Sequence, residues 1–319
     1  MNMNIFFIIA QQSMFFTIPL MIVALGGLFS ERSGIVNIAL EGKMIVGAFS
    51  GILFISTFQE SLPGQPILIL GLLVAMASGM LVSLLHAFAS INMNANQIIS
   101  GVAINMFAPA FAIYVARNVG QTQQVPFIQQ FRIPSVPILG DIPYIGPMFF
   151  QNTFITTFIG FGILVLSTLV LYKTPFGLRL RACGEHPQAA DSVGVNVYGI
   201  RYAGVIISGA LAGIGGVTLI IPTQTNFNAT VSGYGFLALA VLIFGSWKPV
   251  RVLFAALFFG IMQTIASSFT SIDFLMNLGI DARFYRMAPY VATLIVLAFT
   301  SKNMHAPRAA GQPYDKGGR

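Results

Sequence analysis

Long apolar segments alternate with short polar ones along most of this chain. An α-helix needs about 20 apolar residues to cross a bilayer core of about 30 Å, and these segments have that length. They lack the ten-residue segments of alternating polar and apolar residues that are typical of membrane β-barrels. We therefore expect an all-α polytopic membrane protein with about nine (8–10) transmembrane helices, at residues 5–28, 35–56, 67–89, 95–116, 150–172, 203–222, 233–247, 251–270 and 284–301.

The composition agrees with this pattern. Of the 319 residues, 56% are hydrophobic and 8% are charged, whereas soluble domains carry about 25% charged residues. The first basic residue is Arg32, so residues 5–28 are expected to be a retained span and not a cleaved signal peptide. Residues 1–302 are predicted to form one transmembrane domain. Residues 303–319 are polar and rich in Gly and Pro, which predicts a disordered tail.

The formal net charge of +7 does not indicate nucleic-acid binding, because the positions of the basic residues are explained by the orientation of the chain in a membrane. Short loops on the cytoplasmic side carry an excess of Lys and Arg. If residues 173–202 lie in the cytoplasm, the N-terminus lies outside and the C-terminus inside. Eleven of the sixteen basic residues then fall on the cytoplasmic side: Arg32, Lys173, Arg179, Arg181, Arg201, Lys248, Arg251, Lys302, Arg308, Lys316 and Arg319. Cys183 is the single cysteine, which excludes an internal disulfide.

A polar and basic segment, Lys173–Tyr202, interrupts the apolar pattern between two spans. It contains a short predicted helix over residues 188–193. Pro187 suits the first helical position, and Gly194 is able to take the left-handed conformation that ends a helix. The pattern fits either a surface that touches a partner outside the bilayer or an ordinary connecting loop.

The loops and small residues add two structural expectations. Residues 117–149 form one long outer loop with five prolines, which favours irregular, partly extended backbone. In span 203–222, Gly209 and Gly213 are four residues apart, as are Ala212 and Gly216. Small residues at this spacing let another helix approach closely.

No catalytic motif stands out in the sequence. The phosphate-binding loop G-x-x-x-x-G-K-[ST] is absent; Gly42-Lys43 is followed by Met44, and Asn37 stands where the first glycine belongs. The three histidines are scattered, and no metal site is expected. We therefore expect no enzymatic activity and no cofactor in this chain, and a membrane-embedded enzyme is a poor interpretation.

Polar residues inside predicted spans are the candidates for a translocation pathway or gate. Charged groups in a membrane are costly and usually face the bundle interior or a water-filled cavity. In the predicted second span, Gly34, Asn37 and Glu41 would share one helical face. Two roles remain open for this set, a structural contact between helices and a gate. The candidates are Asn37, Glu41, Gln97, Asn105 and Gln224.

Three stretches resemble the permease subunits of bacterial ATP-binding-cassette (ABC) importers, in the branch that handles branched-chain amino acids, ribose-type sugars and nucleosides. Residues 27–42 are similar to the first inner turn of the family, in a form most like nucleoside permeases. Residues 174–194, from Thr174-Pro175-Phe176-Gly177 onward, resemble its cytoplasmic coupling loop. Residues 235–245 resemble the span that follows.

The resemblance implies a location in the bacterial inner membrane and several partners. These are two cytoplasmic ATPase subunits that bind the ATP, a second permease that is related or identical, and an extracytoplasmic solute-binding lipoprotein. The residues expected to couple the permease to the ATPases are Gly177, Arg179, Gly184, Pro187, Ala189, Ala190 and Gly194. The expected solute is a nucleoside.

Alternatives remain open at this point. The cargo of such a permease is alternatively a pentose or a branched-chain amino acid, and a secondary carrier that works without ATP is a different class. Two positions depart from the family pattern: His186 stands where Asn is frequent, and Gln188 replaces a Glu. Because a docking helix presents its surface to a partner, Ala190→Arg is expected to abolish uptake and leave the protein in the membrane.

Overall fold

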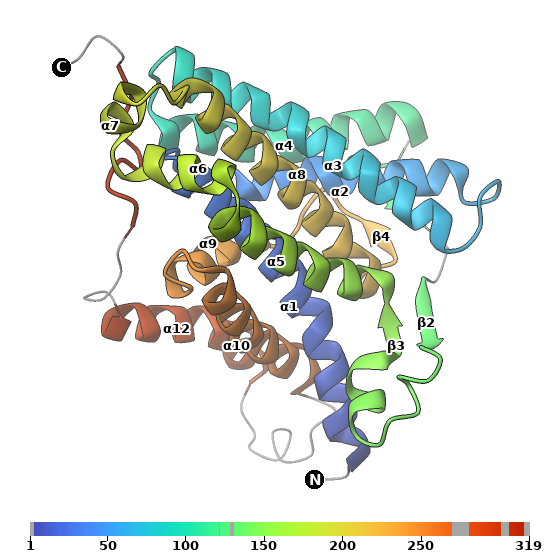
Figure 1. The fold of residues 1–319 in the computed structure, drawn as a ribbon. Coiled ribbons are helices and arrows are strands. Elements are labelled where there is room, and N and C mark those ends of the chain that lie inside the picture. Colours follow the sequence, from blue (N-terminus) through green and yellow to red (C-terminus); the bar gives the residue numbers. More distant parts are fainter. Residues whose placement is uncertain (1–2, 121, 128–130, 270–280, 301–305, 316–319) are drawn as a thin grey trace.

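The computed structural model describes residues 3–120, 122–127, 131–269, 281–300 and 306–315. Helices dominate it, and the N-terminus lies at the opposite end of the molecule from α7 and the C-terminal segment (Figure 1). Seven helices in this described part are long and apolar enough to cross a membrane. They are α1 (Met3–Arg32), α2 (Leu40–Phe58), α3 (Gln65–Ala87), α4 (Gln97–Gly120), α5 (Ile155–Lys173), α8 (Val197–Thr223) and α10 (Pro249–Ser268).

The remaining helical segments are shorter or less apolar. They are the single π-helical turns η1 (Phe88–Asn92) and η2 (Gly146–Phe150) and the helices α6 (Pro175–Glu185), α7 (Pro187–Ser192), α9 (Tyr234–Phe244) and α12 (Ala282–Thr300). The predicted class, an all-α polytopic membrane protein, is confirmed. The count of nine spans stays a prediction: α9 has 11 residues, only about 16 Å at 1.5 Å per residue, and α12 is outside the seven.

The predicted second span begins later than expected. Helix α1 ends at Arg32, Gly34 takes a positive φ of 98°, and residues 33–39 form turns and irregular backbone before α2 starts at Leu40. The N–H of Ile35 donates to the carbonyl of Ser30 and closes the end of α1 (3.2 Å). The prediction that Gly34, Asn37 and Glu41 share one helical face is therefore wrong.

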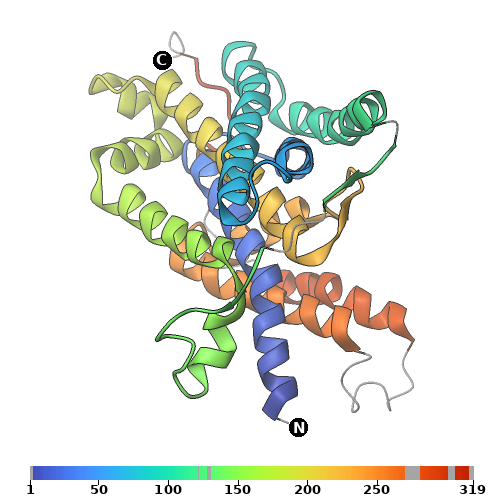
Figure 2. The same ribbon diagram turned by 90° about the vertical axis from the view of Figure 1, so that its right-hand side faces the viewer.

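Four short strands tie the long outer loop to the bundle. Strand β1 (Val125–Pro126) pairs antiparallel with β4 (Asn226–Phe227), and β2 (Arg132–Ser135) pairs with β3 (Gln151–Phe154). Figure 2 shows the β1 and β4 segments side by side. The loop is partly extended, as its prolines predict, and the β1–β4 pair holds it against the segment that follows α8.

Helix α8 lies at the centre of the bundle and packs along α1, α2 and α3. A Cβ added at Gly209 would lie 2.3 Å from the carbonyl oxygen of Gly79 on α3, and one at Gly216 would lie 2.3 Å from the carbonyl oxygen of Met44 on α2. The predicted close approach of helices at these small residues is therefore observed on two sides of α8.

Residues 306–315 pack against the bundle instead of forming part of a disordered tail. The Ala309 N–H donates to the carbonyl of Gly184 (2.8 Å), and the Gly311 N–H donates to the carbonyl of Gly34 (3.2 Å). Tyr314 is buried. These backbone bonds and the buried ring hold a segment whose composition alone predicts disorder; residues 303–305 and 316–319 lie outside the described residues.

Candidate functional site

The polar segment 173–202 folds into two consecutive helices at the end of the molecule opposite the N-terminus (Figure 1). The side chain of Thr174 caps α6 by accepting the Gly177 N–H (3.2 Å). Helix α7 starts at Pro187, and Gly194 follows it with φ 84°. The predicted short helix and both of its end signals are therefore found.

Helix α7 has one buried and one exposed face. Ala190 is 4% exposed and packs with Cys183, Val197 and Tyr314. The exposed face consists of Gln188, Ala189, Ser192 and Val193. Ala190→Arg would drive a charged side chain into this packed cluster, so it tests the folding of the segment and not its docking. The expectation that this variant leaves the protein intact in the membrane is corrected accordingly.

The other residues of the predicted coupling set also divide by exposure. A Cβ at Gly177 would lie 2.1 Å from the carbonyl oxygen of Val170, and one at Gly184 would lie 2.3 Å from that of Arg32. These two glycines let α6 pack against α5 and α1. Arg179 is exposed, as is Gly194. The exposed members of the set are accessible to a partner: Arg179, Ala189 and Gly194. The buried members pack beneath this exposed surface: Gly177, Gly184, Pro187 and Ala190. The coupling role itself remains a prediction.

The burial of Cys183 predicts how its thiol reacts in the folded protein. The side chain is fully buried, and burial raises the pKa of its thiol from 9.0 to about 11, against the opposing effect of the Arg201 charge. The thiolate is the reactive form, and this shift lowers its fraction at pH 7 about a hundredfold. We expect Cys183 to resist maleimide in the folded protein at pH 7 and to react after denaturation. Quenched labelling followed by mass spectrometry measures this; rapid labelling of the folded protein would show that the cluster around Ala190 opens.

A buried polar cluster lies where the irregular segment 33–39 meets α2 and α8. The Nδ2 of Asn37 donates to the Oγ of Ser208 (2.7 Å), and its Oδ1 accepts from the Nζ of Lys43 (2.8 Å). All three side chains are fully buried. Sequence reasoning misses Lys43 and Ser208 as partners of Asn37, because a hydrogen bond from Lys43 back to Asn37 requires the non-helical backbone between them.

Glu41 binds the segment that leads into α9. Its two carboxylate oxygens accept the N–H groups of Gly233 (2.9 Å) and Gly235 (2.7 Å). A Cβ at Gly235 would lie 2.3 Å from the backbone nitrogen of Glu41, so only glycine fits this contact. The sequence predicts neither glycine as a partner, since the contact with Gly233 joins positions 192 residues apart.

Glu41→Gln tests whether this contact holds the two helices together. A carboxamide offers one acceptor and places an NH2 group against the other glycine N–H, so one of the two bonds is lost. Hydrogen bonds to charged groups contribute about 1.5–3 kcal/mol, and we expect a loss of stability of this size as a lower unfolding midpoint in detergent. An unchanged midpoint together with lost uptake would instead favour a gating role for Glu41.

Gln97 and Asn105 on α4 brace the same region. The Oε1 of Gln97 accepts the N–H of Val36 (2.7 Å), and the Oδ1 of Asn105 accepts that of Gly42 (2.8 Å). The Nδ2 of Asn105 donates to the carbonyl of Ile38 (2.9 Å). The structure thus brings together four of the five predicted pathway residues, Asn37, Glu41, Gln97 and Asn105. Their bonds are made to backbone and to buried partners, which is what a structural role requires; a pathway role for them remains a prediction.

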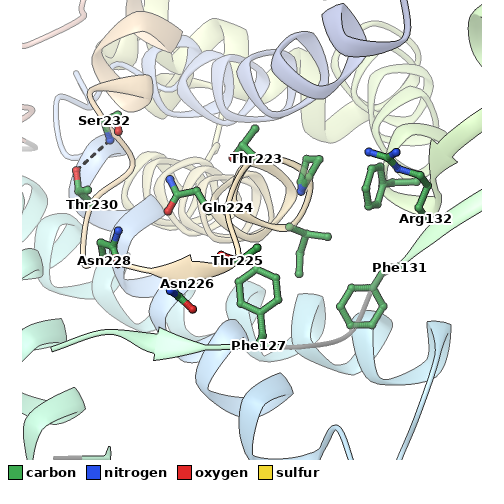
Figure 3. A pocket seen from close by; sticks show the side chains of 13 residues that line it. Phe127, Phe131, Arg132, Thr223, Gln224, Thr225, Asn226, Asn228, Thr230 and Ser232 are labelled. Carbon is green, nitrogen blue, oxygen red and sulfur yellow. Dashed lines mark hydrogen bonds between the residues drawn. The ribbon is translucent and has the colours of Figure 1, made fainter. Parts of the chain in front are cut away.

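Gln224 lies apart from these four, in a cavity of about 680 Å³ between the outer loop and the segment after α8 (Figure 3). Phe127 and Phe131 come from the outer loop, and Gln224, Asn226 and Asn228 come from the other side (Figure 3). Thr223 ends α8, so the cavity lies at the end of that helix remote from α7. The sequence does not predict Phe127 or Phe131 for the pathway, since only the β1–β4 pair brings the outer loop against the segment after α8.

Trp247 and His86 make two further buried polar contacts. Trp247 is 5% exposed and donates from Nε1 to the carboxylate of Glu31 (2.6 Å). It therefore joins the end of α1 to the turn before α10. His86 is fully buried and bonds Ser100 Oγ and the Val36 carbonyl, so it is a satisfied structural residue.

The chain is similar over nearly its whole length to known transport proteins. A family model described as the permease component of branched-chain amino acid transport systems matches residues 9–299. The guanosine ABC transporter permease protein NupQ of Bacillus subtilis (strain 168) is 43% identical over 316 residues, 98% of each chain. The nucleoside ABC transporter permease protein NupC of Lactococcus lactis is 40% identical over 310 residues, 97% of each chain.

A more distant relative carries a different name. The putative glucose ABC transporter permease protein TsgC13 of Haloferax volcanii is 30% identical over 321 residues and covers 93% of this chain and 94% of its own. No solved structure matches the chain.

Proposed function

The chain belongs to the family of permease components described for branched-chain amino acid transport systems, and we propose that it is the membrane-spanning subunit of an ABC importer for nucleosides. The observation that carries the proposal is full-length similarity at 43% and 40% identity to permeases named for guanosine and nucleoside transport. The family description names branched-chain amino acids, and the relative at 30% identity is named for glucose. Both are less specific to this chain than the two relatives at 43% and 40% identity.

The energy for uptake comes from partner subunits in this proposal. The sequence holds no phosphate-binding loop. The exposed face of α7, residues 188, 189, 192 and 193, then docks on a cytoplasmic ATPase subunit, and two such subunits serve the permease and its related or identical partner. A solute-binding lipoprotein delivers the nucleoside from the other side of the membrane.

Charge supports the orientation in which α7 and residues 306–315 face the cytoplasm. Arg32 pairs with Glu185 at 3.5 Å, and its guanidinium also donates to the carbonyl of Trp247 (3.0 Å), the residue before Lys248 in the turn that precedes α10. Arg201 donates to the Gln312 carbonyl (3.2 Å). Basic residues therefore gather at the α7 end, as expected for the cytoplasmic side of a bacterial inner-membrane protein.

Competition for uptake tests the cargo. In the complex assembled with its ATPase and binding-protein partners, uptake of radiolabelled guanosine should fall when unlabelled adenosine or uridine is added, and should be unaffected by ribose or leucine. Strong competition by ribose or leucine with none by nucleosides would overturn the nucleoside assignment and leave the permease class intact.

A further inference from the structure

The cavity beside Gln224 has the lining of a binding site. Its volume of about 680 Å³ falls within the range of roughly 300–1,000 Å³ that small-molecule sites occupy. Phe127 and Phe131 form an apolar wall on the side of the outer loop, and Ile221 and Pro222 at the end of α8 add apolar surface to the lining. The facing wall carries neutral hydroxyl and amide side chains: Thr223, Gln224, Thr225, Asn226, Asn228, Thr230 and Ser232.

The charges in the lining decide which class of ligand fits. Arg132 is the one charged lining residue in the described part of the chain, and no carboxylate lines the cavity there. The Arg132 guanidinium lies 5.8 Å from the ring centroids of both Phe15 and Phe154, where the aromatic faces hold it. The ammonium group of an amino acid would find no anionic partner in this lining, and burying it unpaired is costly.

A neutral ligand with an apolar face and a hydrogen-bonding edge suits the two walls. Each amide offers a donor and an acceptor, and each hydroxyl does the same. The Oε1 of Gln224 is buried and makes no hydrogen bond within the described residues, and an acceptor in that state is costly until a donor reaches it. A nucleoside supplies both parts, since the faces of its base are apolar and its ribose and base edges donate and accept.

The loop that forms the polar wall is anchored at both of its ends. At Asn226 and Phe227 it pairs with β1 of the outer loop, and at Gly233 and Gly235 its N–H groups are held by Glu41. The polar side chains are thereby presented by a supported backbone, as a preformed site requires.

We propose that this cavity is the site at which the permease receives the nucleoside, with the base against the rings of Phe127 and Phe131 and the ribose against Gln224, Asn226 and Asn228. The inference rests on the proposed function and goes beyond it, because it assigns solute recognition to the permease itself. At the end remote from α7, the cavity lies on the side from which an importer takes its cargo.

Photolabelling locates the site directly. The assembled complex is irradiated with 8-azidoguanosine, with and without excess guanosine, and the modified peptides are identified by mass spectrometry. We expect guanosine-sensitive labelling of this chain within residues 122–127, 131–135 or 221–232, and no protection by leucine. Labelling confined to other segments or to the partner subunits would overturn the proposal.

Two cavity variants and one control variant measure the contribution of the amide side chains. Gln224→Met keeps the side-chain length and removes its hydrogen-bonding groups, so guanosine uptake at limiting concentration should fall about five- to tenfold, the effect of one lost hydrogen bond. Asn228→Leu, at an exposed position, should reduce uptake similarly. Gln123→Met changes an exposed glutamine of the outer loop that does not line the cavity and should leave uptake unchanged.

The outcomes separate this inference from the proposed function. If the unmodified complex takes up guanosine and both cavity variants match it, the cavity is not the receiving site although the permease function stands. If the unmodified complex takes up no nucleoside, the proposed function itself fails.

Discussion

Gly213→Leu is expected to abolish recovery of the folded protein. A Cβ at Gly213 would lie 2.1 Å from the carbonyl oxygen of Ala75 on α3. Gly47 of α2 approaches from another side, since its own Cβ would lie 2.3 Å from the Gly213 Cα. The atoms that a side chain at Gly213 would meet are backbone atoms of α3 and cannot turn away, so α8 would have to separate from α3. Overpacking of a core costs about 1–3 kcal/mol and more where backbone must move.

The measurement is the yield of monodisperse protein in detergent, by size-exclusion chromatography of a fluorescent fusion. Gly162→Leu is the matched control, because a Cβ at this position on α5 would meet nothing within 4 Å. We expect the control to give the yield of the parent protein and Gly213→Leu to give almost none. Equal yields from the two variants would contradict the central position of α8 between α2 and α3.

Ala189→Arg is expected to abolish nucleoside uptake and leave the protein folded. Ala189 lies on the exposed face of α7, beside Gln188 and Val193, so a long charged side chain is accommodated in the isolated subunit. The same side chain would obstruct a groove that receives the helix. We expect uptake by the assembled complex to fall by at least about tenfold, since each 1.4 kcal/mol lost in docking is a tenfold change in affinity.

Two further variants make this result specific. Ala189→Ser keeps a small side chain on the same face and should retain uptake. Ala190→Arg, at the buried neighbour, should lower the unfolding midpoint, whereas Ala189→Arg should leave it unchanged. Full uptake by Ala189→Arg in a complex that still contains its ATPase subunits would show that this face of α7 does not transmit the energy.

The sequence predicts those features that local chemistry determines. The membrane class follows from the length of the apolar segments, and α7 follows from Pro187 and Gly194, whose backbone preferences need no tertiary context. The close contact at Gly209 and Gly213 follows from spacing along one helix. Each of these signals lies within a few residues of the feature that it predicts.

Contacts between distant segments escape such reasoning. Glu41 stands out in the sequence as a costly polar residue, but its partners Gly233 and Gly235 have no polar side chain to mark them. The sequence predicts helix from residue 35 because the apolar residues there continue the pattern of a span. The segment 306–315 has the composition of a disordered tail, yet its contacts with Gly184 and Gly34 depend on where α6 and the end of α1 come together.

The residues that line the cavity are also difficult to predict from the sequence. Gln224 is a candidate from the sequence because it is an amide at the end of a span. Phe127 and Phe131 lie far earlier in the chain, in a proline-rich loop, and only the pairing of β1 with β4 places them opposite it. Recognition of a family therefore identifies the class of transporter, and the three-dimensional arrangement is needed to propose where the solute binds.

Reconstitution into proteoliposomes tests the central claim most directly. The chain is incorporated together with its partner permease, with and without the ATPase subunits, and accumulation of radiolabelled guanosine is followed with loaded binding protein on one side and ATP on the side that α7 faces. We predict accumulation only when the ATPase subunits and ATP are both present. Guanosine flux of equal size through the chain alone, driven by an ion gradient and indifferent to ATP, would contradict the account and identify a secondary carrier.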